Sequence, residues 1–164
     1  MIVPFSARGF TLAEMVLVLA LMSLLGSLTA FVNIGAYKRL LARTDVDRIV
    51  GALVQARSEA MHGVCKANIC DTPPPHGVRV GRNEVTVFEG SSYSDRIATV
   101  DETFFLDGTM ASGTNEVVFV PITGEVSDGL DIFLTGVEGS ASNTWHVQIA
   151  TSGNITSNAM RVDN

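Results

Sequence analysis

One carboxylate stands out in this sequence because it lies within an otherwise uncharged apolar stretch. Glu14 comes four residues after Phe10, and the other residues from Phe10 to Val32 are Phe, Leu, Ala, Met, Val, Gly, Ser and Thr. A carboxylate in such a segment costs roughly 2.5 kcal/mol or more to place in a bilayer, which favours a function and a positively charged partner. We therefore predict a functional role for Glu14.

The two cysteines are the second group that could do chemistry. Cys65 and Cys70 enclose four residues, and the chain has no other cysteine. Zinc would need two further ligands, which the sequence does not supply at ligand spacing. Free thiols are expected if the segment is cytosolic, whereas a small disulfide loop is expected if it lies outside the cytoplasm. Such a short ring would fix a turn rather than hold the fold together.

The remaining polar residues form no catalytic constellation. Three histidines lack a carboxylate or cysteine at ligand spacing and are predicted to lie at the surface or on an edge strand: His62, His76 and His146. Three acids could approach a cation near a loop but lack EF-hand spacing: Glu125, Asp128 and Asp131. Nucleophile-elbow, zinc-protease and glycine-rich phosphate-loop patterns are also missing. The sequence thus predicts no enzyme, no cofactor and no bound metal.

Length and charge bound the remaining possibilities. The chain has 164 residues with a net charge of −6, so we do not expect it to bind nucleic acid. Residues 1–9 are predicted to be a cleaved leader peptide. Removing the N-terminal stretch as far as residue 34 leaves enough chain for one domain. A secretory signal cut after Ala30 is the alternative, although its apolar run is too long and Leu28 suits the cleavage site poorly.

Two helical segments are predicted to position these groups. Residues 10–34 are apolar over about the 20 residues that a transmembrane helix needs. Residues 35–63 continue as an amphipathic helix, since apolar residues recur at spacings of three and four: Tyr37, Leu40, Leu41, Val46, Ile49, Val50, Leu53 and Val54. The charged residues Asp45, Asp47, Arg48, Arg57 and Glu59 are predicted to lie on its solvated surface.

After Gly63 the pattern changes to the alternation that is typical of strands. We predict strands over 77–80, 84–88, 97–100, 103–106, 116–121, 130–135 and 145–150, with a further edge strand within 153–162. The predicted fold is α+β: a long N-terminal helix, with a transmembrane half and an amphipathic half, packed on one antiparallel sheet in a β-rich domain over 64–164.

The N-terminal motif resembles the processing site of type IV pilins and pseudopilins. It reads Arg8-Gly9-Phe10-Thr11-Leu12-Ala13-Glu14 ahead of the apolar run. The resemblance implies that a prepilin peptidase cuts between Gly9 and Phe10, and that the new amino group of Phe10 is methylated. It also implies that Glu14 pairs with this amine and sets the axial register of a filament.

A weaker resemblance extends over the rest of the chain. The stretch from Leu53 to Met61 that leads to Cys70, and the closing segment from Ile149 to Gly153, are similar to the minor pilins of the GspH/FimT family. DNA-uptake members carry arginines after the last glycine, but here none follows Gly153 until Arg161, which again argues against DNA binding.

These resemblances imply a structural subunit rather than an enzyme. We expect an H-type minor pseudopilin of a type II secretion pseudopilus, which assists filament assembly and protein export. A minor pilin of a type IV pilus, serving motility, adhesion or DNA uptake, is the alternative. The implied partners are other pilins through the N-terminal helix, the prepilin peptidase and methyltransferase, the inner-membrane assembly platform and membrane lipid, with the domain in the periplasm.

Overall fold

The computed structural model describes residues 11–67, 70–112, 115–136 and 143–161, without the side chains of residues 28–36, 143 and 159–161. The predicted cleavage and methylation residues, Gly9 and Phe10, lie outside the described residues, as does the predicted leader. The chain divides into two compact units, Met1–Tyr37 and Lys38–Asn164. Helix α1 spans Leu12–His62, and its side chains are described over stretches of 16 and 26 residues.

The expected transmembrane half of this helix is not found. Among the described residues, no helix is long and apolar enough to cross a membrane. The prediction of a long N-terminal membrane-spanning helix is therefore wrong for the part of the chain that the structure describes.

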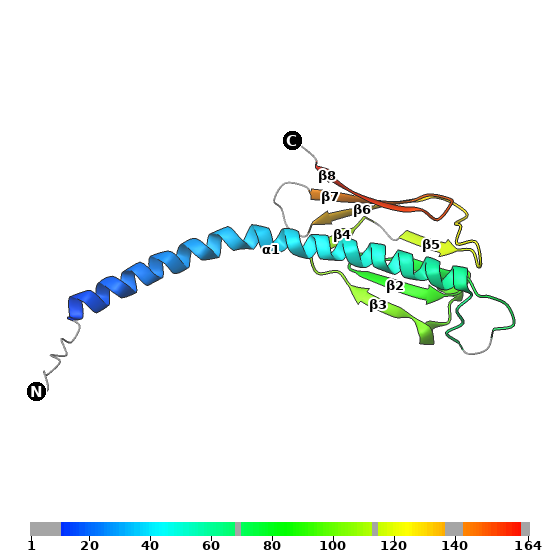
Figure 1. The fold of residues 1–164 in the computed structure, drawn as a ribbon, viewed down its shortest axis with the longest axis horizontal. Helices are drawn as coiled ribbons and strands as arrows, with labels where there is room; N and C mark the ends of the chain where they lie inside the picture. Colours follow the sequence, from blue (N-terminus) through cyan, green and yellow to red (C-terminus); the bar gives the residue numbers. More distant parts are fainter. Residues whose placement is uncertain (1–10, 68–69, 113–114, 137–142, 162–164) are drawn as a thin grey trace, which may run out of the picture. The chain divides into compact units, whose positions relative to one another are not determined.

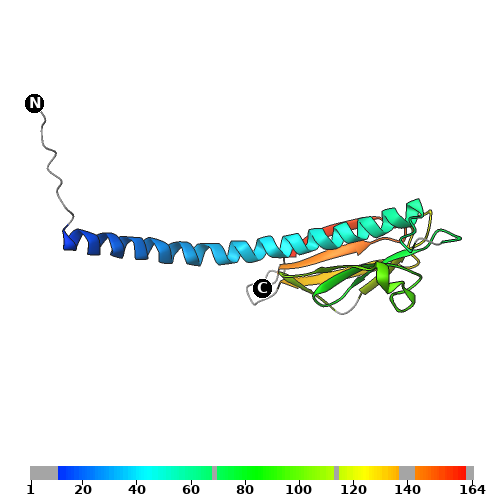
Figure 2. The same ribbon diagram turned by 90° about the horizontal axis from the view of Figure 1, so that it is seen from below.

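The strands form two antiparallel sheets rather than the single sheet that the sequence predicted (Figures 1 and 2). The first has the order β3-β2-β1-β5, with β3 Glu102–Phe105, β2 Glu84–Glu89, β1 His76–Val80 and β5 Asn115–Phe119. The second has the order β4-β6-β7-β8, with β4 Thr109–Ala111, β6 Leu130–Gly136, β7 Asn143–Ile149 and β8 Ile155–Arg161. Two short 3-10 turns, η1 Tyr93–Asp95 and η2 Ala98–Val100, precede β3.

Two of the strand predictions need correction. The segment 97–100, predicted as a strand, contains η2 instead, and β4 was not predicted at all. β4 has only three residues, too few for an alternating pattern to be recognised. It pairs with β6 and not with its sequence neighbour β3, so the chain passes from the first sheet to the second between Phe105 and Thr109. The chain then returns to the first sheet in β5 and enters the second again in β6.

One hydrophobic core joins both sheets to the C-terminal half of α1, residues 38–62. Figure 2 shows this half, in cyan, lying along one side of the strands. Its buried apolar residues recur every three or four positions: Ala42, Val46, Ile49, Ala52, Leu53, Ala56 and Ala60. The predicted residues Tyr37, Leu40 and Val54 are mostly exposed instead. Alanines occupy the contact face because a small side chain lets the helix backbone approach the sheets closely.

Asp45 provides a buried polar contact between this helix and the sheets, although the sequence predicted it on the solvated surface. It is 1% exposed. Its carboxylate accepts hydrogen bonds from the backbone N–H groups of Asp107, Gly108 and Thr109, at 3.3, 2.6 and 2.9 Å, and from the Thr109 hydroxyl at 3.2 Å. The prediction was wrong because these donors are more than sixty residues away in sequence.

We predict that Asp45→Ala lowers the free energy of unfolding by about 3 kcal/mol or more, because it leaves several buried N–H groups without an acceptor. Chemical denaturation of the full chain in mild detergent measures this change. Asp47→Ala is the matched control, because Asp47 is exposed on the same helix and should change the stability by less than about 0.5 kcal/mol. Equal effects of the two substitutions would contradict the role given to Asp45.

Candidate functional site

The carboxylate of Glu14 lies at the N-terminus of α1, where it forms a capping box with Thr11. The Thr11 backbone N–H and hydroxyl donate to Glu14 Oε2 at 3.0 and 3.1 Å, and the Glu14 N–H donates to Thr11 Oγ1 at 3.3 Å. A threonine followed three residues later by glutamate satisfies two otherwise unpaired N–H groups of a helix start. The negative charge also lies at the positive end of the helix dipole. Glu14 therefore has a local structural role that the sequence reasoning did not include.

The apolar side chains behind Glu14 are exposed on the whole circumference of the helix. The large ones are between 46% and 82% exposed: Leu12, Met15, Val16, Leu17, Val18, Leu19, Leu21, Met22, Leu24 and Leu25. Consecutive residues of a helix point in directions about 100° apart, so the run from Met15 to Leu19 alone covers every side. A helix that is apolar all round is stable only when other apolar groups surround it.

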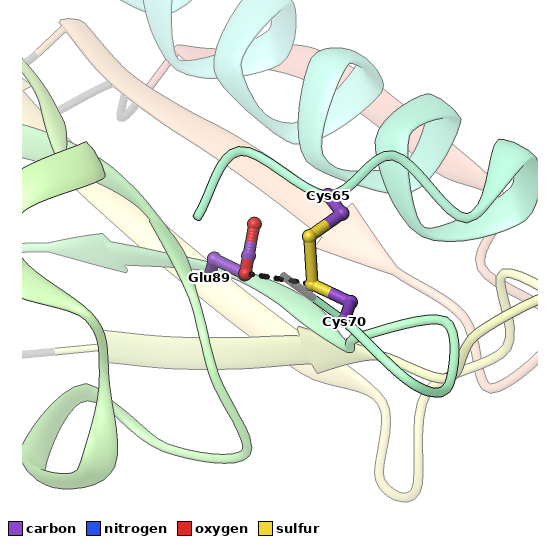
Figure 3. A group of neighbouring side chains, drawn as sticks. All are labelled: Cys65, Cys70 and Glu89. Atoms are coloured by element: carbon purple, nitrogen blue, oxygen red, sulfur yellow. Dashed lines mark hydrogen bonds between the residues drawn. A yellow bond between two sulfur atoms is a disulfide. The ribbon is translucent and has the colours of Figure 1, made fainter. Parts of the chain in front are cut away.

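The second group of predicted residues lies where the loop after α1 meets β2 (Figure 3). Cys65 and Cys70 are joined in a disulfide. Glu89, the last residue of β2, is 1% exposed and lies beside it. One carboxylate oxygen, Oε2, accepts the backbone N–H of Lys66 at 2.7 Å, and the other, Oε1, lies 3.7 Å from Cys70 Sγ. No pattern in the sequence pointed to Glu89, because it lies 19 residues beyond Cys70.

A network of charged side chains extends from this loop to the helix. The Lys66 ammonium donates to Glu102 Oε1 and forms an ion pair with Glu59 Oε1, at 2.7 and 2.8 Å. The Gln55 amide donates to both carboxylates. Burial alone would lower the pKa of Lys66, but the hydrogen bonds to Glu102 and Glu59 raise it above its usual value. Donation from Lys66 and Gln55 holds the pKa of Glu102 below its usual value.

His76 completes this network from β1. Its side chain is fully buried, whereas the sequence predicted a surface or edge-strand histidine. Nε2 lies 2.8 Å from the carbonyl oxygen of Val64, which can only accept, so Nε2 carries the hydrogen. Nδ1 lies 3.3 Å from Glu59 Oε2. Both atoms are buried, and neither has a hydrogen-bond partner among the described residues.

The other predicted polar residues are not brought together. His62 contacts the Ser58 carbonyl oxygen within the last turn of α1, at 2.7 Å. His146 on β7 stacks on Phe133 and pairs with Asp131 at 2.8 Å. Within the described ranges, the one group of three metal-ligating side chains is Cys65, Cys70 and Glu89, so Glu125, Asp128 and Asp131 do not form a cation site there.

An open cleft of about 310 Å³ lies between α1 and strands β7 and β8. It is lined by Arg43, Val46, Asp47, Trp145, Ser157 and Asn158. These side chains do not form the nucleophile and base pair that acyl transfer requires, nor a set of metal ligands.

Comparison with models of protein families, with characterised proteins and with solved structures gave no match to this chain.

We predict that the ion pair between Lys66 and Glu102 makes the free energy of unfolding decrease as the pH becomes acidic. Because the folded-state pKa of Glu102 is lowered, its contribution is present above the ordinary glutamate pKa of about 4.3 and is lost as the pH falls through the folded-state value. Glu102 is nearly half exposed, so the contribution is below about 1 kcal/mol. Denaturation of the full chain at pH 7 and pH 3 should show a smaller difference for Glu102→Gln than for the unchanged chain. The exposed Glu125→Gln is the control, and the same reduction in that variant would contradict the assignment.

Proposed function

We propose that this chain is a non-enzymatic structural subunit of a filament, a minor pseudopilin of a type II secretion system that assists assembly and protein export. The observation that carries the proposal is the exposure of apolar side chains all around α1 between Leu12 and Leu25. Such a surface is stabilised by packing against similar helices, which is how subunits would be held in a filament core. The globular unit, with its own core and disulfide, would then lie on the outside.

The N-terminal motif supports the same proposal. In it, peptidase cleavage after Gly9 frees the amino group of Phe10, and this amine becomes the partner of the Glu14 carboxylate. In a poorly hydrated filament core, an amine and a carboxylate attract strongly. Glu14 would exchange its contacts with Thr11 for this ion pair, either within one subunit or between neighbours. The disulfide supports a location of the domain outside the cytoplasm, since such bonds persist in oxidising compartments.

A minor pilin of a type IV pilus is the second function that the N-terminal motif favours. The two functions differ in the process that depends on the filament. Deleting the gene and measuring exoprotein secretion alongside twitching motility and DNA uptake distinguishes them. Loss of secretion alone supports the pseudopilus, and loss of motility or uptake alone supports the pilus.

We predict that Glu14→Gln reduces incorporation into filaments by about tenfold, which corresponds to a loss of about 1.4 kcal/mol. The amide can still accept the Thr11 N–H, so the helix cap is kept while the charge is lost. The matched variant Thr11→Val removes the hydroxyl contacts of the cap and keeps the charge, and it should assemble almost normally. Immunoblots of filament and membrane fractions measure the ratio. If Thr11→Val loses incorporation and Glu14→Gln does not, Glu14 is only a capping residue.

We also predict that the mature chain begins at N-methylated Phe10. Mass spectrometry of the protein purified from its host tests this, because cleavage after Gly9 and addition of one methyl group give a defined mass. An intact Met1, or a cut after Ala30, would contradict the processing step and remove the proposed partner of Glu14.

A further inference from the structure

We propose that Cys65, Cys70 and Glu89 form a binding site for a thiophilic divalent cation such as Zn²⁺ when the disulfide is reduced. The two sulfur atoms and a Glu89 carboxylate oxygen lie within 4.8 Å of one another (Figure 3). Two thiolates and one carboxylate, with water in the fourth position, are a donor set that zinc accepts. The site is separate from the filament contacts of α1 and does not rest on the proposed function.

The state of Glu89 is the observation that points to a ligand. Its side chain is almost completely buried, and among the described residues only Oε2 receives a hydrogen, from the backbone N–H of Lys66. Oε1 faces Cys70 Sγ at 3.7 Å, but a disulfide sulfur carries no hydrogen, so this contact does not satisfy the oxygen. A buried carboxylate oxygen without a donor is costly. A cation held by the sulfurs would supply the missing positive partner.

The chemistry balances with an external dithiol or phosphine as the reductant. The Cys65–Cys70 bond takes two electrons and two protons, which gives two thiols and the oxidised reductant. Cation binding then replaces the two thiol protons, which pass to water, and forms two metal–sulfur bonds and one metal–oxygen bond. The two thiolates and the carboxylate carry three negative charges against two positive ones.

Contacts around the site hold Glu89 and the residue next to Cys65 in place without the disulfide. Lys66, next to Cys65, is anchored by its backbone N–H to Glu89 and by its ammonium to Glu59 and Glu102. Glu89 is held in β2, where it pairs with His76 of β1. The Cα atoms of the two cysteines are 6.1 Å apart. Reduction therefore frees the sulfurs while Lys66 keeps the start of the loop attached to α1 and to the first sheet.

The test uses the full chain in detergent, reduced with a phosphine and titrated with Co²⁺ as a spectroscopic substitute for Zn²⁺. We expect one ion per chain, with a thiolate-to-cobalt charge-transfer band that Zn²⁺ displaces. The oxidised chain should show no band. Glu89→Gln, which keeps the shape and can still accept the Lys66 N–H, should weaken binding by about tenfold or more. The control Glu125→Gln changes an exposed acid outside the site and should bind like the unchanged chain.

Three results would overturn the proposal. The first is a reduced chain that keeps its circular dichroism spectrum but shows no charge-transfer band. The second is Glu89→Gln binding as tightly as Glu125→Gln, which would leave the carboxylate without a role. The third is a reduced chain that unfolds even when Zn²⁺ is in excess, because the site requires the folded arrangement of the loop and β2.

Discussion

The structure of the globular unit depends on the burial of one helix carboxylate against a turn of the sheets. Asp45 accepts three backbone N–H groups between Asp107 and Thr109, where the chain leaves the first sheet and enters the second. Bonds between a carboxylate and backbone N–H groups are charge-assisted and stronger than neutral ones. A Cβ atom on Gly108 would lie 2.5 Å from the Ala42 nitrogen, so only glycine permits this close approach.

Arg57 ties the same helix to the sheets nearer its C-terminus. Its guanidinium donates to the carbonyl oxygens of Gly124 and Ser152, at 3.2 and 3.1 Å. Gly124 follows β5 of the first sheet and Ser152 follows β7 of the second. One side chain therefore holds a turn from each sheet, and Asp45 holds the crossing between them. Through these two contacts, one amphipathic helix is attached to both sheets, which share a single hydrophobic core.

Structural features that depend on neighbouring residues were predicted from the sequence, whereas side-chain roles that depend on distant residues were missed. The apolar spacing correctly indicated that Val46, Ile49 and Leu53 are buried, because helix periodicity is local. The roles of Asp45, Arg57 and Glu89 depend on partners far along the chain, and a charged residue is by default expected at the surface. Glu14 was selected because its neighbours are apolar, yet Thr11, three residues away, already supplies its hydrogen bonds.

For Glu14, Asp45 and Glu89, the hydrogen-bond donors that each carboxylate receives are therefore a better guide to its role than its neighbours in the sequence. Glu14 is satisfied by Thr11, so the role in assembly that we propose for it would require a change of partner. Asp45 receives five hydrogen bonds, four from the turn at Asp107–Thr109 and one from Arg48, and has no remaining capacity, which makes it structural. Glu89 is as buried as Asp45, but among the described residues it receives one hydrogen, and its second oxygen lies 3.7 Å from Cys70 Sγ. Because burial without donors is unfavourable, Glu89 is where this fold retains the capacity to bind a cation.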